Sequence, residues 1–394
     1  MRVSVLDNID AVPAAQWNAL AGDQFPFLRH EFLAALEHTG CVGERFGWIP
    51  NHLIAHDDNG NLVGAVPLYQ KFNSYGEFVF DWSWAEAYQK AGLAYYPKLV
   101  AAAPYTPATG PRLLVKESPQ RKQIADALIA MALDLSHRHE FSSLHWLFTS
   151  QEDTGRLEQH GLLRRTGYQF HWRNQGYRDF DHFLACLKSE KRKKLQRERR
   201  HVREANLKLQ VIHGNDATEF ELETMDHFYQ SIYQRKWGFP TLNLAFFQEI
   251  AATMGESLVI VLAYDNNQPV AGAFNLRGRD TLYGRYWGCR SNYHSLHFEA
   301  CYYQGIEYCI RQGLQRFEPG AQGEHKISRG FLPTPTWSAH WIADDRFRMA
   351  IGNFLDHESA AVHENIQQLT SHSPYKQTGA TSPALGSPAK VLLP

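Results

Sequence analysis

Cysteine is scarce in this chain, and the cysteines are not spaced as in a metal-binding motif or a disulfide framework. The five residues are Cys41, Cys186, Cys289, Cys301 and Cys309, and no two of them form a CxxC pair. Isolated cysteines argue against a zinc ribbon and favour a reducing compartment.

Long apolar runs are also missing. No stretch approaches the roughly 18 consecutive apolar residues that a membrane-spanning helix needs. The first ten residues, "MRVSVLDNID", carry acids where a signal peptide has an apolar segment. We therefore expect a soluble, cytoplasmic protein without a transmembrane segment.

Three common enzyme motifs do not occur: the GxSxG elbow, the P-loop and the GxGxxG fingerprint. Hydrolase, NTPase and dinucleotide-binding functions therefore have no support from motifs. The pairs His137/His139 and His357/His363 do not have a carboxylate at the spacing found in zinc-binding motifs such as HExxH. We predict no metal site.

The sequence does contain two similar halves. Its 394 residues are 44% hydrophobic and 13% aromatic, which favours two domains with separate cores. "LIAHDDNGNLVGAVPLYQKFNSYG" (53–76) aligns without a gap to "VLAYDNNQPVAGAFNLRGRDTLYG" (261–284), with eight identities in 24 positions. Each copy predicts a three-stranded antiparallel meander. A duplication and a shared hairpin pattern would both explain the match.

The segments after each copy alternate between helix and strand. We interpret 82–115 as an aromatic insertion, followed by a helix at 119–138, a strand at 143–148, a helix at 152–160 and a strand at 168–174. The second copy is followed by a helix at 295–312, a strand at 314–318, a Gly-rich loop and a strand near 337–343. This alternation predicts α/β layers.

We therefore predict two domains, residues 1–178 and 179–371, each with a mixed, mainly antiparallel sheet flanked by helices. The remaining residues, 372–394, are rich in Ser, Pro, Gly and Ala. Such a composition cannot bury enough apolar surface to order the chain, so we predict a disordered tail.

A strongly basic segment lies where the halves join. Residues 188–206 hold nine Lys or Arg and three Glu, whereas the whole chain has a formal charge of −1. The helix predicted over 183–206 has one narrow apolar stripe, formed by Leu184, Leu187, Leu195 and Val202. Such a helix would dock by that stripe with its cations facing out. A solvated helix between domains is the simplest interpretation.

The order of elements and several motifs resemble a known family. The order meander, helix, strand, helix, strand is that of the GNAT acyltransferase fold, and a tandem pair resembles the FemAB-like group. "PFLRHEFLAALE", "YGEFVFDWSWAEAY", "GRYWGC" and "PGAQGEHKISRGFLPTPTWSAHWI" are similar to the bacterial FemAB-like family of peptidoglycan biosynthesis or recognition proteins. The resemblance covers about residues 26–342. It implies tandem GNAT-like domains and an N-acyltransferase that acts on an amine, such as one on a peptidoglycan precursor.

The resemblance also bears on the donor. FemAB-type enzymes take an aminoacyl group from tRNA, which implies a basic docking surface. CoA-dependent GNAT enzymes instead hold the pyrophosphate at a glycine-containing turn. The corresponding segment here, "RSNYHSLHF" (290–298), has no glycine. Aminoacyl-tRNA is therefore the expected donor and acyl-CoA the alternative, with no tightly bound cofactor.

The predicted catalytic residues lie around the Gly-rich loop. In a GNAT-like sheet the donor carbonyl lies where two strands splay apart, here 282–287 and 314–318, and the loop at 320–326 follows directly. Glu324 or His325 could take the proton from an amine, and Tyr302 could protonate the leaving group. A surface turn with Glu–Lys pairing is the alternative interpretation of this loop.

Other residues are candidates for substrate binding. Gln322, Lys326 and Arg329 could stabilise an oxyanion, and Arg290 opens the turn before the helix at 295–312. In the first half, Lys98 and Arg112 could line an acceptor groove formed by "YYPK" and "PYTPATGPR", which could equally be a proline-stiffened surface loop. The helix residues His297, Glu299, Tyr302 and Tyr303 also suit core packing.

The basic helix supplies the candidates for phosphate binding: Lys191, Arg192, Lys194, Arg197, Arg199 and Arg200. They could dock a tRNA or a nucleotide-linked substrate, and such binding would depend steeply on salt. Two alternatives remain open. The protein could bind nucleic acid on a non-catalytic GNAT-like scaffold, or the helix could adhere to anionic lipid headgroups.

Overall fold

The computed structural model describes residues 1–235, 238–291, 293–321 and 323–376. The strands of the first half are β1 (Arg2–Leu6), β2 (Trp48–Pro50), β3 (His52–His56), β4 (Leu62–Val66), β5 (Leu68–Lys71), β6 (Lys98–Ala101), β7 (Leu114–Val115), β8 (Ser143–Thr149) and β9 (Leu163–Arg173). Those of the second half are β10 (Lys208–His213), β11 (Leu258–Asp265), β12 (Gln268–Arg277), β13 (Thr281–Cys289), β14 (Arg316–Glu318) and β15 (Leu332–Ile342).

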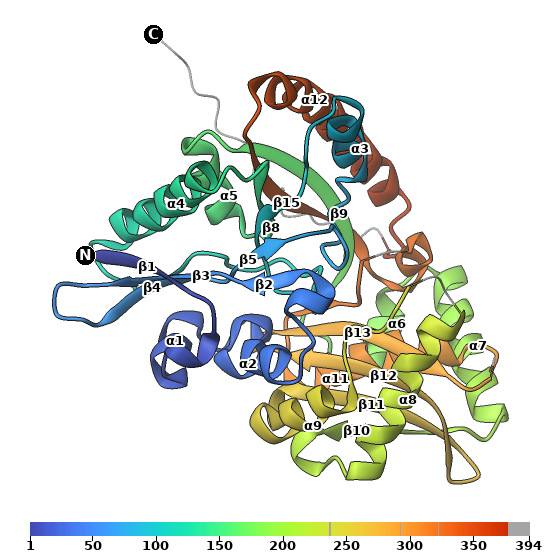
Figure 1. Cartoon of the computed structure of the whole chain (residues 1–394). Helices are drawn as coiled ribbons and strands as arrows, with labels where there is room; N and C mark the ends of the chain where they lie inside the picture. The colour runs from blue at the N-terminus through green and yellow to red at the C-terminus, as the bar shows by residue number, and fades with distance from the viewer. Residues whose placement is uncertain (236–237, 292, 322, 377–394) are drawn as a thin grey trace.

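Helices cover the sheets, as the predicted α/β layers require (Figure 1). Those of the first half are α1 (Ala14–Ala21), α2 (His30–His38), α3 (Trp82–Lys90), α4 (Arg121–Arg138) and α5 (Gln151–Gln159). Those that follow are α6 (Phe180–Cys186), α7 (Ser189–Glu204), α8 (Glu219–Arg235), α9 (Leu244–Thr253), α10 (Leu296–Phe298), α11 (Gln304–Gln312) and α12 (Asp345–Ser371).

One sheet of eleven strands contains strands from both halves of the chain. Its order is β10-β11-β12-β13-β14-β9-β15-β8-β6-β5-β2, and a smaller sheet has the order β1-β3-β4-β7. In the large sheet β9, from the first half, pairs with β14 and β15, whereas β15, from the second half, pairs with β8 and β9. Each half therefore completes the sheet of the other.

The internal repeat is confirmed for the second copy and wrong for the first. Strands β11, β12 and β13 form the predicted antiparallel meander. In the first half β3 pairs with β4, but β5 leaves for the large sheet, where it pairs with β2 and β6. Pro67 separates β4 from β5, and proline cannot donate a hydrogen bond to a ladder. The aligned residue of the second half, Asn275, lies inside β12.

The aromatic segment 82–115 is part of the core rather than an insertion. It forms α3 and then β6, which pairs in parallel with β8 and antiparallel with β5. The sequence pattern hid this strand because β6 is only four residues long. Helix α3 packs on α12 through a cluster that includes Trp84, Tyr88 and Ile351 (Figure 1).

The predicted basic helix at 183–206 is two helices. α6 ends at Cys186 and α7 begins at Ser189, because the residues between them pair with the chain after α12: the Lys188 amide donates to Pro374 O at 2.8 Å. Tyr375 is bridged to Leu187, so the predicted tail is ordered up to Lys376, and 377–394 lie outside the described residues. The apolar stripe is confirmed, since all four of its residues are buried.

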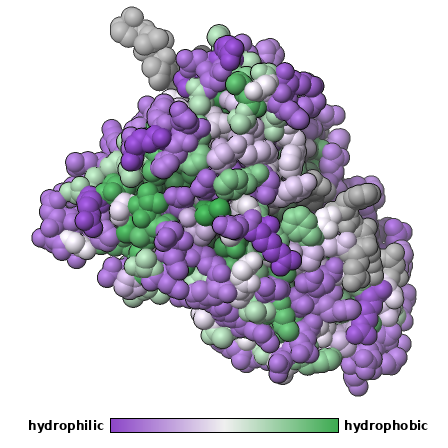
Figure 2. Space-filling view, in the orientation of Figure 1, coloured by the Kyte–Doolittle hydropathy of each residue, from purple (hydrophilic) through white to green (hydrophobic). Residues whose placement is uncertain are grey.

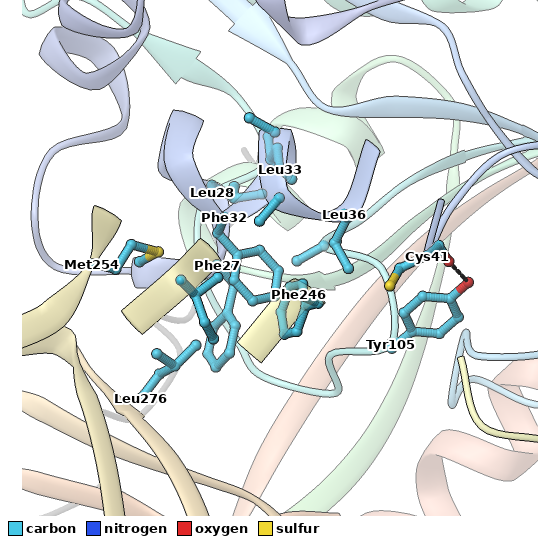
Figure 3. Close-up of a cluster of buried hydrophobic side chains, with 14 of the residues drawn as sticks. Phe27, Leu28, Phe32, Leu33, Leu36, Cys41, Tyr105, Phe246, Met254 and Leu276 are labelled. Atoms are coloured by element: carbon cyan, nitrogen blue, oxygen red, sulfur yellow. Dashed lines mark hydrogen bonds between the residues drawn. The ribbon is translucent and has the colours of Figure 1, made fainter. Parts of the chain in front are cut away.

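Aromatic side chains join the halves near the large sheet. Phe32 of α2 contacts Phe246 of α9 edge to face, with ring centroids 5.8 Å apart, and Phe27 lies against Tyr283 of β13 at 5.2 Å. The Tyr105 hydroxyl donates to Cys41 O at 2.7 Å in the same region (Figure 3). The surface shown in Figure 2 is mainly hydrophilic, with hydrophobic residues in small groups. The largest hydrophobic cluster thus contains residues of both halves.

Candidate active site

A notch opens in the large sheet where β13 and β14 part. The two strands pair in parallel only from Thr281 to Tyr283, opposite Arg316–Glu318, and β13 continues to Cys289 paired only with β12. A β-bulge interrupts the β12–β13 register beside the notch, because Phe274 faces Tyr286 and Asn275 faces Gly284. Bulges commonly lie next to active sites, where they redirect a side chain. The predicted splaying of these strands is confirmed.

The notch widens into a pocket of about 350 Å³. The polar and aromatic side chains that line it are Asn275, Arg285, Tyr286, Trp287, His297, Cys301, Tyr302, His325 and Lys326. They come from β12, β13, the helix after β13 and the loop after β14, so the second half alone builds most of this site. The loop residues Pro319, Gly320 and Ala321 close one side.

The helix predicted at 295–312 contains a π-helical turn. α10 is followed by the π turn Glu299–Tyr303 and then by α11. The extra residue of a π turn changes which side chains face the sheet, and such turns frequently occur at functional sites. Here the turn brings Cys301 and Tyr302 to the pocket, while Glu299 points to the other side, toward α7.

Two of the predicted catalytic residues meet in this pocket. The Tyr302 hydroxyl lies 2.9 Å from His325 Nε2. Partial loss of hydration in the pocket wall lowers the pKa of His325, and the positive charges of Arg329, Lys326 and Lys194 lower it further. The imidazole is therefore neutral at pH 7, and one ring nitrogen is available to accept a proton. Burial raises the pKa of Tyr302, so its hydroxyl keeps its proton.

Lys326 provides a buried cation in the same pocket. The residue is 2% exposed, and its ammonium donates to Gly320 O at 2.7 Å. Burial lowers the pKa of Lys326 to about 8, so most of it still carries a charge at pH 7. A buried ammonium with solvent on one side only can stabilise negative charge that develops on a substrate oxygen.

Arg329 holds the loop in place instead of facing the pocket. Its guanidinium bonds to Glu198 of α7 at 2.7 Å and donates to His325 O at 2.7 Å. It also lies over the Phe298 ring, 3.4 Å from the centroid. The predicted oxyanion role therefore needs correction: Arg329 positions the backbone of His325.

Breaking this ion pair should destabilise the fold. Glu198→Ala leaves a buried guanidinium unpaired, which typically costs about 3–5 kcal/mol. The matched control is Glu204→Ala on the same helix, whose partner Arg200 lies 3.7 Å away at the surface, and exposed pairs contribute at most about 1 kcal/mol. Urea unfolding measures both. Equal losses in the two variants would contradict the role of the Glu198–Arg329 pair.

One family model, FemAB-like, described as peptidoglycan biosynthesis/recognition, matches residues 8–377. The chain belongs to the FemAB-like family. No curated protein matches it. Among solved structures it is similar to FemX, with a TM-score of 0.54 and 12% identity over 89% of this chain and 100% of FemX.

A second structure similar to this FemAB-like protein is the C-terminal domain of an Agrobacterium fabrum protein named for lysylphosphatidylglycerol synthesis. The TM-score is 0.51, with 9% identity over 87% of this chain and 96% of that domain. At such identities the likeness shows the fold alone. The fold class predicted from the sequence, tandem GNAT-like domains with α/β layers, is confirmed. Within the described part of the FemAB-like chain, no helix is long and apolar enough to cross a membrane.

Two predicted acceptor residues of the FemAB-like chain are structural. Lys98 is completely buried and donates to Ser74 and Glu77, both at 2.8 Å. Arg112 is also completely buried and donates to Leu147 O at 2.9 Å. The predicted acceptor groove therefore needs correction, because both cations already serve the packing of the first half.

The remaining predicted site residues are not part of the described pocket wall. Glu324 is exposed and does not line the pocket, so its catalytic role stays a prediction. Arg290 is exposed at the end of β13, also outside the pocket wall. Gln322 lies outside the described residues.

The cations of the basic helix α7 differ in their contacts. Arg199 is held by Glu299 at 2.9 Å and Glu307 at 2.8 Å, so its predicted phosphate-binding role needs correction. Lys194 instead reaches the active-site loop, where its ammonium lies 3.3 Å from Ser328 Oγ. Lys191 and Arg197 are one helical turn on either side of Lys194, on the same face.

Sequence reasoning missed Arg285, the residue displaced by the bulge. Its guanidinium donates to Tyr105 O of the first half and lies over the Phe27 ring, 5.5 Å from the centroid. The motif "GRYWGC" contained this arginine. The signal available in the sequence was a positive charge within an otherwise aromatic strand. The bulge that turns Arg285 toward the pocket could not be recognised from the sequence.

Proposed function

We propose that this protein transfers an aminoacyl group from a tRNA ester to a primary amine and forms an amide. The observation that carries the proposal is the pocket at the β13–β14 notch, where a neutral histidine paired with a tyrosine lies beside a buried ammonium. Base and cation are the two groups that acyl transfer to an amine needs. A cell-wall precursor amine is an acceptor consistent with the family description.

The proposed step begins when the amine nitrogen attacks the ester carbonyl carbon. The carbonyl oxygen becomes an oxyanion, stabilised by the Lys326 ammonium and by backbone N–H groups of β13 beyond its pairing with β14. The amine proton passes through the Tyr302 hydroxyl to His325 Nε2. The C–O bond to the ribose then breaks, and the departing oxygen takes the proton back. The products are an amide and a tRNA with a free hydroxyl.

The positive charge around the pocket favours a donor in which the aminoacyl group is attached to a polyanion. Lys194 contributes to the lowered pKa of His325, so the cationic face of α7 reaches the active site itself. A tRNA backbone lying along Lys191, Lys194 and Arg197 would deliver its 3′ ester toward the loop. The segment between β13 and α10 contains no glycine, which does not favour the pyrophosphate of acyl-CoA.

The test is equilibrium binding of aminoacylated and uncharged tRNA across a salt titration. We expect tighter binding of the charged form and a steep fall in affinity with salt. The triple variant Lys191→Ala, Lys194→Ala and Arg197→Ala should reduce the salt slope by about 1 for each phosphate that no longer meets a cation.

Arg203→Ala is the matched control, because Arg203 is exposed on another face of the same helix, beside Arg199. It should leave the slope close to that of the unaltered protein. Equal binding of both tRNA forms would contradict an aminoacyl donor. Equal slopes in the triple variant and the control would contradict the docking face.

A further inference from the structure

A second pocket adjoins the active site on the far side of the loop after β14. Its volume is about 280 Å³, and Ala321 forms part of the wall of both pockets. Besides Ala321, seven of its lining residues are apolar or aromatic: Phe78, Val79, Phe80, Phe148, Tyr168, Trp337 and Val362. They come from the loop after β5 and from β8, β9, β15 and α12, so both halves build this pocket.

Most of the polar side chains of this wall already have protein partners. Tyr168 accepts from Asn365 Nδ2 at 3.0 Å, and Gln169 donates to Pro107 O at 2.7 Å. The Ser338 hydroxyl lies 2.8 Å from His340 Nε2. A ligand that enters here therefore meets mainly apolar surface, and a polar ligand would give up hydrogen bonds to water without regaining them.

The charged side chains of the wall, Arg165 and Glu358, form an ion pair with each other. Arg165 is its cation, and both Arg165 Nε and Nη2 bond to Glu358 at 2.8 Å, while Nη1 donates to Phe80 O at 2.7 Å. Glu358 lines the same pocket. A phosphate would have to break a bidentate ion pair to gain this arginine, which makes a nucleotide a poor occupant.

The aromatic lining continues to the protein surface. Phe80 is 57% exposed and Tyr75 is 58% exposed, and the Tyr75 ring lies 5.1 Å from that of Trp82 and 6.1 Å from that of Phe239. Exposed aromatic groups next to a pocket are typical of a binding site for an apolar ligand. Of these rings, Phe80 is the one that lines the pocket and also reaches the protein surface.

We propose that this second pocket holds the body of the acceptor, and that the acceptor is a primary amine attached to an uncharged, apolar group, aromatic or aliphatic. This inference rests on the proposed function, because the amine would reach past Ala321 to His325. It departs from a nucleotide-linked acceptor, whose phosphates would find no available cation in the described wall of this pocket.

The test is calorimetric binding of phenethylamine to the full-length protein without any donor, with UDP as the phosphate-bearing probe. We expect saturable binding of phenethylamine that UDP does not displace. Phe80→Ala should weaken it about fivefold, the effect of removing one aromatic ring from the wall. Val362→Trp should abolish it by filling the pocket from α12.

Matched controls are available on the same helix. Phe354→Ala and Met349→Trp change residues of α12 that are 48% and 67% exposed and do not line the pocket, so binding should be unchanged. Displacement by UDP, no saturable binding, or equal effects of Phe80→Ala and Phe354→Ala would overturn the inference. Binding without transfer to any amine would instead overturn the proposed function and leave the apolar-amine pocket standing.

Discussion

His325→Ala should lower the rate of amide formation by about 10²–10⁴-fold, the range for loss of a positioned general base. In the proposed step the imidazole, hydrogen-bonded to Tyr302, receives the amine proton, and without it the attacking nitrogen would keep that proton. The measurement is single-turnover transfer of a labelled aminoacyl group from tRNA to a primary amine. Binding of the charged tRNA should change little, because the proposed phosphate contacts lie on α7 and not on His325.

Two further variants show which group acts as the base. Tyr302→Phe removes the hydroxyl and should give a smaller loss, since water can replace it between the amine and His325. Glu324→Gln tests the other base predicted from the sequence. A loss with Glu324→Gln as large as that with His325→Ala would move the role of base to the exposed carboxylate, and normal turnover in His325→Ala would remove the site assignment.

Lys326→Met should lower the rate by about 10²–10³-fold, the typical effect of removing one oxyanion-stabilising group. Methionine has a similar length and no charge, so the packing of the loop should survive. Circular dichroism and urea unfolding serve as the control for folding. An unaltered rate constant in a folded Lys326→Met protein would exclude this ammonium from the reaction.

The same two residues predict how the rate depends on pH. The proposed transfer needs His325 neutral, so the rate should rise as pH increases through the His325 pKa, which is below its ordinary value. Transfer also needs Lys326 protonated, so the rate should fall as pH increases through the Lys326 pKa of about 8. Lys326→Met should lose only the alkaline decline. An alkaline decline that persists in this variant would assign it to another group.

Much of the site could be predicted because its parts are local in sequence. The loop after β14 combines glycines with His325 and Lys326 in a few residues, and the strands that splay apart were visible as the meander and the strand after the next helix. Tyr302 was predicted as an acid on the helix after the meander, with core packing as the alternative. The structure confirms that Tyr302, His325 and Lys326 come together.

The errors concern contacts between residues distant in the sequence. Arg199 and Arg329 resemble substrate-binding cations in the sequence, but their carboxylate partners lie about one hundred residues away or more. Lys98 is neutralised by Glu77 within a fully buried network. A charge pattern shows only how many charged residues lie close together in the sequence. It cannot distinguish a cation that is available to a ligand from one that is already paired with a carboxylate.

The position of β15 has a consequence for synthesis on the ribosome. β15 is the strand between β8 and β9, yet it is made more than 150 residues after β9. Until it emerges, the nascent first half carries two open strand edges, which are templates for wrong pairing. The chain must therefore delay final closure of its sheet, or rely on a chaperone, until the second half has left the ribosome.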